Sequence, residues 1–471
     1  MSETITEMIL PGTYIDVRAE GLIGVGGIST GNIGVVGTAN RGPVDEVRIL
    51  SSYADALDTF GAYDAWPTNS ADIPKALTLT RTLEQLFRGG ASTVYAVRVG
   101  DFGAGGPQTR SYAVDDATGT IFTISASSPG TWANTLVLAF DAAANKLTAT
   151  LGRQKEEFTG ANAGELVQAI SDGSRLIVVS SPPASADESR VPTAVTASAA
   201  VATNGEQIAT TQIGNGLTLF AGEEVNIVAI GGFDAKAAAA TVLAHLEATE
   251  NDGKERIAVI GASSDDAAKI KSDDAAAVSN ARVVLVAPGI VAEDAARAGT
   301  DKRVKLPAPY AAALVAGRLA TLGVHVSLTN KDVAAIDVST PYSRGIQKDL
   351  LQNRVLVLKK ELGIRVLKGI STDTGPFRQI SVRRTVDYAK AGVRIGSNPY
   401  IGRLNNSRVR AALKATLDGF LSQMILDEML TGYTLDVSAT RAQEIAGQAI
   451  VTMTLQPTFS IDFIKVIMNL Q

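Results

Sequence analysis

Short apolar runs and helical periodicities alternate along the first hundred residues of this 471-residue chain. The run "NIGVVGTA" (32–39) predicts a buried strand, and "IPKALTLTRTLEQLFRGG" (73–90) predicts a helix that ends at two glycines. "STVYAVRVG" (92–100) predicts a second strand, whereas residues 1–20 alternate only weakly and are typical of an arm. The pattern therefore favours an α/β organisation for residues 21–100.

The pattern changes after residue 100. Between residues 101 and 220, short alternating runs such as "TIFTISA" and "RLIVVSS" are separated by frequent turn signals, which predicts a small β-rich module with an exposed loop at 180–205. Residues 221–340 return to strands such as "RVVLVAPG" alternating with helices such as "PAPYAAALVAGRLATLG". That alternation is typical of parallel βαβ units.

The last part of the chain begins with basic segments that the pattern predicts to be strands: "NRVLVLKK", "IRVLKGI" and "RQISVRRTVDY". A helix follows from about residue 405 to 431, preceded by Asn and Ser and followed by Gly432. Two further strands are predicted at the end, "AIVTMTLQ" and "FSIDFIKVIMNLQ".

The C-terminal segment 458–471 is unusually apolar for a chain end. Burying one such side chain contributes roughly 1.5–3 kcal/mol, so its exposure to water would be unfavourable. The segment is therefore expected to pair in a sheet, and two alternatives remain open. It could complete the chain's own sheet, or it could add a strand to the sheet of a neighbouring copy. Its apolar residues are Ile461, Phe463, Ile464, Val466, Ile467, Met468 and Leu470.

Composition indicates a globular protein of several domains, with 45% apolar and 19% charged residues. The absence of cysteine excludes disulfides and thiolate metal sites, and only His245 and His325 could supply imidazole. No apolar run is long enough to cross a bilayer, and the first residues do not have the pattern of a signal peptide. We therefore expect a soluble protein without a cofactor, a metal site or a membrane-inserted segment.

Charge is unevenly distributed along the chain. The net charge is −5, yet residues 341–410 carry 15 Lys/Arg against 4 Asp/Glu, a local balance of +11. This stretch could form a solvated basic face or a surface that contacts an acidic partner. A nucleic-acid-binding role is a further alternative, although the chain contains no recognised nucleic-acid-binding motif.

The glycine-rich stretch at 21–43 contains a partial dinucleotide-binding fingerprint and a literal G-x-S-x-G. A dinucleotide fingerprint would start at Gly24, but its sixth position is Ser29 and a strand follows instead of a helix. The G-x-S-x-G at 27–31 fails as a nucleophile elbow for the same reason. We predict no catalytic residues, and a nucleotide-binding α/β enzyme remains the alternative from a different functional class.

Several segments, taken in their order, resemble the tail sheath proteins of contractile-tailed phages and related contractile injection systems. They are "PGTYIDV" followed by "GVVGTANRGPVDEV", "SASSPGTWANTLVL" (125–138), "FRQISVRRTVDYAKAGV" and "LTGYTLD". Two departures stand out: Ala133 occupies a position where the family usually has glycine, and "LKGISTD" (367–373) replaces the family's "WGxRT".

The resemblance implies a mixed α/β, discontinuous multi-domain fold with extended terminal arms. The expected domains are an N-terminal arm (1–20), a first core part (21–100), an inserted β-rich outer domain (101–220), a central α/β section (221–340), a C-terminal sheath domain (341–457) and a C-terminal arm strand (458–471).

The family's function implies a structural subunit rather than an enzyme. Copies would form stacked hexameric rings in a helical array around an inner tail tube protein, and contraction would drive the tube through a target cell envelope. Baseplate and tail terminator proteins are the other expected partners, with no nucleic acid and no membrane insertion. The expected location is the virion tail, assembled in the cytoplasm of the host bacterium.

The resemblance also implies roles for particular residues. The family's arms donate strands to neighbouring subunits, and this implies inter-subunit arm strands at Tyr14, Ile15, Val17, Ile461, Phe463, Ile464, Val466, Met468 and Leu470. A basic surface is the candidate for contacting the tube, formed by Arg403, Arg408, Arg410 and Lys414.

Overall fold

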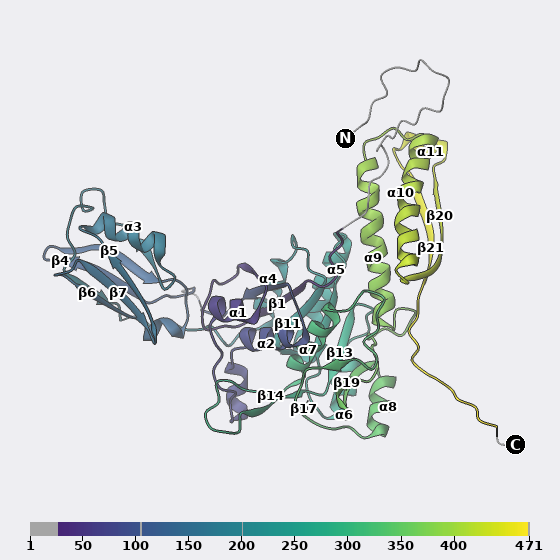
Figure 1. The fold of residues 1–471 in the computed structure, drawn as a ribbon, viewed down its shortest axis with the longest axis horizontal. Helices are drawn as coiled ribbons and strands as arrows, with labels where there is room; N and C mark the ends of the chain where they lie inside the picture. The colour runs from purple at the N-terminus through teal and green to yellow at the C-terminus, as the bar shows by residue number, and fades with distance from the viewer. Residues whose placement is uncertain (1–26, 104–105, 200, 470–471) are drawn as a thin grey trace, which may run out of the picture. The chain divides into compact units, whose positions relative to one another are not determined.

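The computed structural model describes residues 27–103, 106–199 and 201–469 (Figure 1). The described chain divides into two compact units. The larger unit comprises residues 31–321 and 328–375, and the smaller comprises residues 322–327, the chain from Pro376 onward and the described residues before Gly31. Eleven helices and several sheets in this part of the chain confirm the predicted mixed α/β, multi-domain class.

The larger unit is built on a nine-stranded sheet with the order β16-β19-β18-β13-β12-β11-β1-β3-β2. The six strands from β18 to β3 are parallel to one another, whereas β19 pairs antiparallel with β18 and β2 pairs antiparallel with β3. Every residue of β1, β3, β12 and β13 is buried, which explains why these strands are continuous apolar runs in the sequence. The bounds are β1 Ile33–Gly37, β2 Val47–Leu50, β3 Val94–Arg98, β11 Ile227–Asp234, β12 Ile257–Gly261, β13 Val283–Ala287, β16 Asp332–Val333, β18 Val355–Glu361 and β19 Gly363–Val366.

Helices pack on this sheet and give it a shared apolar core. The helices of the larger unit outside the β-rich module are α1 Tyr53–Phe60, α2 Leu79–Gly89, α4 Thr210–Thr218, α5 Ala235–Asn251, α6 Ala267–Lys269, α7 Ala308–Ala320 and α8 Arg344–Gln352. A small three-stranded sheet lies in the same unit, formed by β14 Ile290–Glu293, β15 Arg303–Leu306 and β17 Asp337–Val338. No helix in the described part of the chain is both long and apolar enough to span a bilayer.

Two glycines allow α2 and α7 to approach closely. A Cβ placed on Gly89 would lie 2.5 Å from the carbonyl oxygen of Leu314, and one on Gly317 would lie 2.2 Å from the carbonyl oxygen of Leu86. The two helix backbones are therefore in direct contact, which larger residues would prevent.

The β-rich stretch predicted between residues 101 and 220 contains two antiparallel sheets with a separate apolar core. Residues 210–220 differ from that prediction, because they form α4 and the turn after it, and pack in the core of the nine-stranded sheet. The sheets consist of β4 Ser111–Asp116, β5 Gly119–Ala126, β9 Ile177–Ser181 and β10 Ala194–Ala197, and of β6 Val137–Asp141, β7 Lys146–Leu151 and β8 Gln154–Thr159. One helix, α3 Ala163–Gly173, accompanies them.

Arg98, the last residue of β3, joins the segment after β5 of this module to the nine-stranded sheet. Its buried guanidinium donates from Nη1 to the carbonyl oxygens of Gly42 (2.8 Å) and Pro129 (2.7 Å). Gly130 has a φ of +138°, and a Cβ there would lie 1.8 Å from the carbonyl oxygen of Asn40. The "SPGTW" part of the 125–138 segment is thus a close backbone contact that requires glycine.

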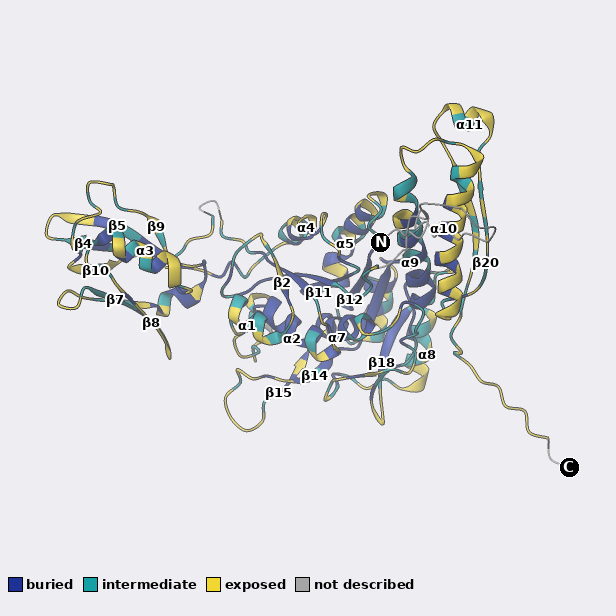
Figure 2. Ribbon diagram, turned by 45° about the horizontal axis from the view of Figure 1, so that its top comes forward, coloured by how far each residue is buried: buried dark blue, intermediate teal, exposed yellow. Residues whose placement is uncertain are grey.

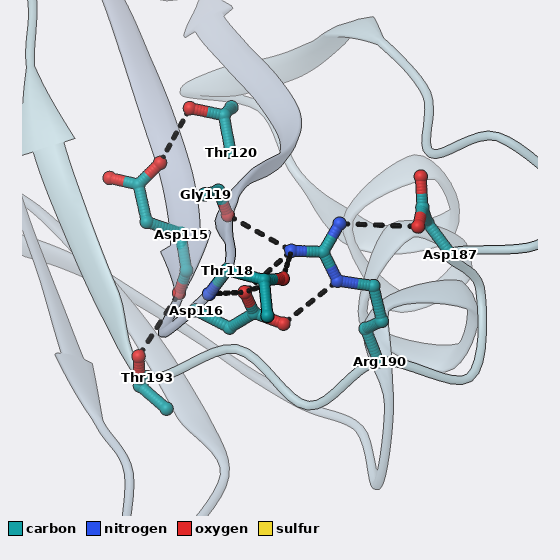
Figure 3. A network of polar contacts seen from close by, with 8 residues as sticks. All are labelled: Asp115, Asp116, Thr118, Gly119, Thr120, Asp187, Arg190 and Thr193. Atoms are coloured by element: carbon teal, nitrogen blue, oxygen red, sulfur yellow. Dashed lines mark hydrogen bonds and ion pairs between the residues drawn. The ribbon is translucent and has the colours of Figure 1, made fainter.

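A polar network holds the loop before β10 against the β4–β5 turn (Figure 3). Arg190 donates from Nε to Asp116 at 2.8 Å, from Nη1 to Asp187 at 3.1 Å and from Nη2 to the carbonyl oxygen of Gly119 at 3.1 Å. Hydrogen bonds from Arg190 and Thr118 hold the pKa of the Asp116 carboxyl well below its usual range. Part of the loop predicted at 180–205 is therefore ordered, with β10 inside it.

The smaller unit contains two long helices and a hairpin: α9 Ile380–Ser397, α10 Ser407–Leu426, β20 Leu430–Ser438, α11 Arg441–Ile445 and β21 Ile450–Pro457. The strand predicted for "RQISVRRTVDY" is wrong, because residues 380–388 belong to α9 and Gln379 is its N-cap. Its buried positions Thr385, Ala389, Gly392 and Gly396 are spaced by four, three and four residues, as one face of a helix requires. The β-branched and basic residues of α9 made this helical period hard to recognise in the sequence.

The basic stretch 341–410 is divided between the two units rather than forming one domain. Its first part supplies β18 and β19 to the nine-stranded sheet, and its last part supplies α9 and the start of α10. Residues 341–375, predicted within the C-terminal domain, therefore pack in the larger unit.

Candidate assembly interface

The nine-stranded sheet has a topological switch point between β1 and β11, where an enzyme of this architecture would bind its ligand. This place is filled in the structure. The amides of Thr78 and Leu79, at the start of α2, both donate to the carbonyl oxygen of Thr38, at 3.1 and 2.8 Å. A Cβ on Gly232, near the end of β11, would lie 2.4 Å from the Thr78 methyl group. These two amides of α2 already have an acceptor within the chain, so they are not available to bind a phosphate.

His245 has a structural environment within the larger unit. Its Nε2 lies 2.9 Å from Nη1 of Arg256, whose Nη2 donates to the carbonyl oxygen of Glu223 at 3.0 Å. Burial and the positive charge of Arg256 lower the pKa of His245 to about 4, so the neutral ring accepts the hydrogen bond. Among the described residues, no three His, Asp or Glu side chains are grouped so that they could hold a metal ion.

The C-terminal segment after β21 is half-buried at Thr458, Ser460 and Asp462 and exposed at its other described residues. Residues 458–469 form neither helix nor strand, so the strand predicted for "FSIDFIKVIMNLQ" is absent from a single copy (Figure 2). The predicted arm residues in this segment are between 71% and 84% exposed: Ile461, Phe463, Ile464, Val466 and Met468. The other predicted arm residues, Tyr14, Ile15, Val17 and Leu470, lie outside the described residues.

The hairpin of β20 and β21 is a sheet of only two strands, and within the described chain no third strand pairs with it. Residues alternate along both strands between half-buried and exposed. Tyr433, Leu435 and Leu455 pack on the cluster between α9 and α10, whereas Thr434 and Thr454 face solvent. A two-stranded sheet has marginal stability, and both outer edges of this one could accept another strand.

The four basic residues predicted to face the tube are not equivalent. Arg410 donates to Glu444 at 3.0 Å and to Asn405 at 2.8 Å, and Nζ of Lys414 lies 3.7 Å from Asp436. These two cations therefore neutralise acidic groups of the hairpin within the same unit.

Arg403 and Arg408 are exposed, and the chain near them carries apolar residues that the sequence pattern did not single out. Ile401 and Leu404, in the loop between α9 and α10, are each 78% exposed. The loop is held in place, since Asn405 donates to the carbonyl oxygen of Gln448 at 2.8 Å. The sequence does show two apolar residues, Ile401 and Leu404, shortly before a long basic helix, and this feature could have indicated the surface.

Several other arginines of the basic stretch point inward. Arg384 is buried and donates to the carbonyl oxygens of Thr30 (3.0 Å) and Leu322 (3.2 Å), which attaches two separate segments to α9. Arg354 donates to the carbonyl oxygen of Ala275 at 3.0 Å. The local charge of +11 thus does not correspond to a single basic surface.

Gln379, which sequence reasoning missed, connects the C-terminal segment to α9. It occupies the N-cap position of α9 without capping the helix through its side chain. Instead, its Nε2 donates to Asp462 at 3.2 Å, and its Oε1 accepts from the amide of Ser460 at 3.4 Å. Glutamine at an N-cap, where Ser, Thr, Asp or Asn is preferred, was the available signal.

Two family profiles match the chain in succession. The phage tail sheath protein central domain matches residues 206–372, and the phage tail sheath C-terminal domain matches residues 372–471. The chain belongs to the phage tail sheath family. The resemblance predicted from the sequence segments is thereby confirmed.

Known relatives of this sheath-family protein agree with that assignment. The tail sheath protein of Bacillus phage SP01 is 26% identical over 209 residues, which are 42% of this chain and 36% of the relative. The match thus spans about a third of that protein's length.

Solved sheath structures share the fold. The sheath tail protein of Desulfitobacterium hafniense has a TM-score of 0.62 at 18% identity, with 95% of this chain and all of that chain covered. The helical sheath of the anti-feeding prophage in its contracted state has a TM-score of 0.57 at 15% identity, with 98% of this chain and 99% of that chain covered. These likenesses establish a common fold.

Proposed function

We propose that this sheath-family protein polymerises as stacked hexameric rings in a helical array around an inner tail tube. Contraction of the array drives the tube through a target cell envelope. The proposal includes a baseplate and a tail terminator as partners at the two ends, and assembly in the cytoplasm of the host bacterium. No catalytic step is required, because the work comes from new contacts between subunits.

The exposed apolar C-terminal segment is the observation that carries this proposal. It places several large side chains in water, which is unfavourable unless a partner covers them. The same chain has a hairpin with two open edges, to which an extended segment can add through backbone hydrogen bonds. Each copy therefore carries a strand to donate and an edge that accepts one, and such head-to-tail pairing produces an open polymer.

Strand exchange also suits a polymer that must rearrange without falling apart. A paired strand is held by several backbone hydrogen bonds, whereas contacts between compact units can break and re-form independently. The segment that connects the donated strand to its own unit can change direction while the pairing persists. Subunits would thus stay linked during contraction.

A second surface is proposed to contact the tube. Arg403 and Arg408 supply exposed positive charge, and Ile401 and Leu404 supply exposed apolar area. Together they suit a tube surface with acidic and apolar groups. Reversing both charges with Arg403→Glu and Arg408→Glu should reduce assembly on the tube while the fold is retained. Normal tube-bound particles from this variant would count against the assignment.

The central test compares the full chain with a chain that ends at Asp462. Negative-stain imaging and sedimentation, with and without the tube protein, should find long tubes for the full chain and small species for the shortened one. Circular dichroism should be the same for both, since the removed residues are exposed. A full chain that remains a small closed oligomer, and whose melting temperature rises with a nucleotide, would instead support the enzyme alternative.

A further inference from the structure

The β18–β19 hairpin ends in the most exposed large apolar side chain of the described residues. The two strands pair up to the residues on either side of Leu362, so this residue alone forms the turn, and it is 94% exposed. Nζ of Lys360 lies 2.5 Å from Asp337, and Ile336, next to that aspartate, is 42% exposed. Exposed apolar area that is rimmed by polar residues is typical of a contact site for another protein.

Positive charge surrounds this exposed turn. Residues 344–366, which span α8 and the β18–β19 hairpin, carry six Lys or Arg and two Asp or Glu, a balance of +4. The pKa of the Glu361 carboxyl is lowered by its hydrogen bond with Lys359 and by the positive charges of Arg365 and Arg344. The start of α8 therefore lies near the end of the hairpin. What we call the β18–β19 surface is defined by the exposed side chains of Arg344, Lys348, Lys360 and Leu362.

The two cations of α8 are not used within the described chain. Among the described residues, the side chains of Arg344 and Lys348 make no hydrogen bond and no ion pair. Arg344 is also the first residue of α8, where the helix dipole disfavours positive charge. Lys348 follows one helical turn later, so the two like charges repel each other. Cations at such locally unfavourable positions are expected to serve a partner outside the copy.

An acidic surface lies at the opposite edge of the same sheet. The turns at 221–226 and 247–255 carry six Asp or Glu and one Lys, and they lead into β11 and β12. The strands from β11 to β18 are parallel, so these turns lie where the strands begin, whereas the β18–β19 turn lies where they end. Arg256 and Arg282, just before β12 and β13, are buried and add no exposed positive charge. What we call the α5 surface is defined by the exposed side chains of Glu224, Glu247 and Asp252.

The two surfaces are complementary but cannot meet within one copy, because they lie at opposite edges of one sheet. Their charges are opposite, and among the described residues the side chains of Glu247 and Asp252 make no hydrogen bond and no ion pair. Such a pair of surfaces suits a head-to-tail contact between copies, which produces an open polymer. A nucleic acid is another acidic partner, but the exposed Leu362 and the carboxylate of Glu361 beside it disfavour a polyphosphate.

We propose that the β18–β19 surface of one copy docks on the α5 surface of a second copy, with Leu362 inside the contact. This inference rests on the proposed function, and it names a contact between larger units in which the terminal segments take no part. The cations of α8 then lie near the carboxylates at the end of α5, and the apolar turn is removed from water.

Charge reversal in two matched variants tests this contact. One variant carries Arg344→Glu and Lys348→Glu, and the other carries Glu247→Lys and Asp252→Lys, all at exposed positions. Each variant alone places like charges across the contact and should raise the critical concentration for polymerisation roughly tenfold, measured by sedimentation at low salt. An equimolar mixture of the two variants should polymerise nearly as well as wild type, because each reversed surface then meets its opposite on the other variant.

Recovery on mixing distinguishes a lost contact from a damaged fold, since two misfolded chains would not rescue each other. If the mixture polymerises no better than either variant, or if both variants polymerise like wild type, the contact is excluded and the sheath function stands. If only the α8 variant is impaired, and it has lost binding to double-stranded DNA, nucleic acid is the partner and the proposal is overturned. A wild-type chain that forms no polymer would count against the proposed function itself.

A second variant, Leu362→Ser, tests the apolar part of the contact. Loss of the buried side chain should raise the critical concentration for polymerisation roughly three- to tenfold. Ile49→Ser is the matched control, because Ile49 is 63% exposed on β2, the last strand at the other end of the sheet order. Equal critical concentrations for the two variants would exclude Leu362 from the contact.

Discussion

The ring of Phe420 on α10 occupies the space where a side chain on Gly392 of α9 would begin. A Cβ on Gly392 would lie 2.0 Å from Cζ of Phe420, and the ring centroid of Tyr388 is 5.8 Å from that of Phe420. The glycine therefore allows α9 to approach the aromatic side chain that anchors α10. This contact supports the hairpin, since Phe420 belongs to the apolar cluster on which Tyr433 and Leu435 pack.

Gly392→Ala should destabilise the smaller unit. The added methyl group forces Phe420 to move, and overpacking of this kind costs about 1–3 kcal/mol. Urea unfolding followed by circular dichroism, with hydrogen exchange on α9 and α10, would measure the effect. Gly419→Ala on α10 is the matched control, because no heavy atom lies within 4 Å of a Cβ there. Equal stabilities for the two variants would contradict the role of the close contact.

Gly130→Ala should disrupt the contact between the β-rich module and the loop after β1. A Cβ at this position would overlap the carbonyl oxygen of Asn40, and the backbone has a positive φ. The ring centroid of Trp132 lies 5.0 Å from the guanidinium of Arg41, so the fluorescence of Trp132 reports on this contact.

The control for Gly130→Ala is Gly119→Ala. Gly119 also has a positive φ, of +129°, but no heavy atom lies within 4 Å of its Cβ position. Both variants carry the cost of backbone strain, about 1 kcal/mol or more. Only Gly130→Ala should shift the emission of Trp132 and lower stability by several kcal/mol. A comparable loss in both variants would show that strain alone is responsible.

The pattern of apolar residues over short stretches predicted several buried strands and helices correctly. The buried strands β1, β3, β12 and β13 are continuous apolar runs, and α10 buries residues at helical spacing. The period of α9 was hidden, because it buries arginines and glycines rather than large apolar residues on one face. Arg384 can be buried because the carbonyl oxygens of Thr30 and Leu322 accept hydrogen bonds from its guanidinium. No local sequence pattern reveals such distant partners.

The candidate interface was predicted only in part, for a related physical reason. The apolar character of the C-terminal segment is a sequence property, but its pairing depends on a surface outside the segment. The bonds of Gln379 to Ser460 and Asp462 join residues about eighty positions apart, so only the structure showed where the C-terminal segment leaves α9. Likewise, only the structure separated Arg410 and Lys414, which have acidic neighbours, from Arg403 and Arg408.

Stability should fall between pH 6.5 and pH 4 through His245. Its folded-state pKa is lowered to about 4, below the ordinary value of 6.5, so the unfolded chain binds more protons in this range. The full contribution is present above pH 6.5 and is lost as the pH falls to 4, a change on the order of 3 kcal/mol. Urea unfolding of the wild type and of His245→Gln across this pH range would isolate the contribution of His245 to the free energy of unfolding. Parallel pH profiles for the two proteins would contradict the assignment.

Gln379→Ala should weaken polymerisation without weakening the fold. The side chain holds Ser460 and Asp462, and its loss would let the C-terminal segment leave α9 earlier and in more directions. Losing hydrogen bonds of this kind should raise the critical concentration roughly three- to tenfold. Gln423→Ala is the matched control, since Gln423 is exposed on α10 and donates to Asp427 at 2.9 Å. Sedimentation would measure polymer formation and thermal unfolding would measure stability. If both variants polymerise like wild type, the donated strand does not depend on its attachment to α9.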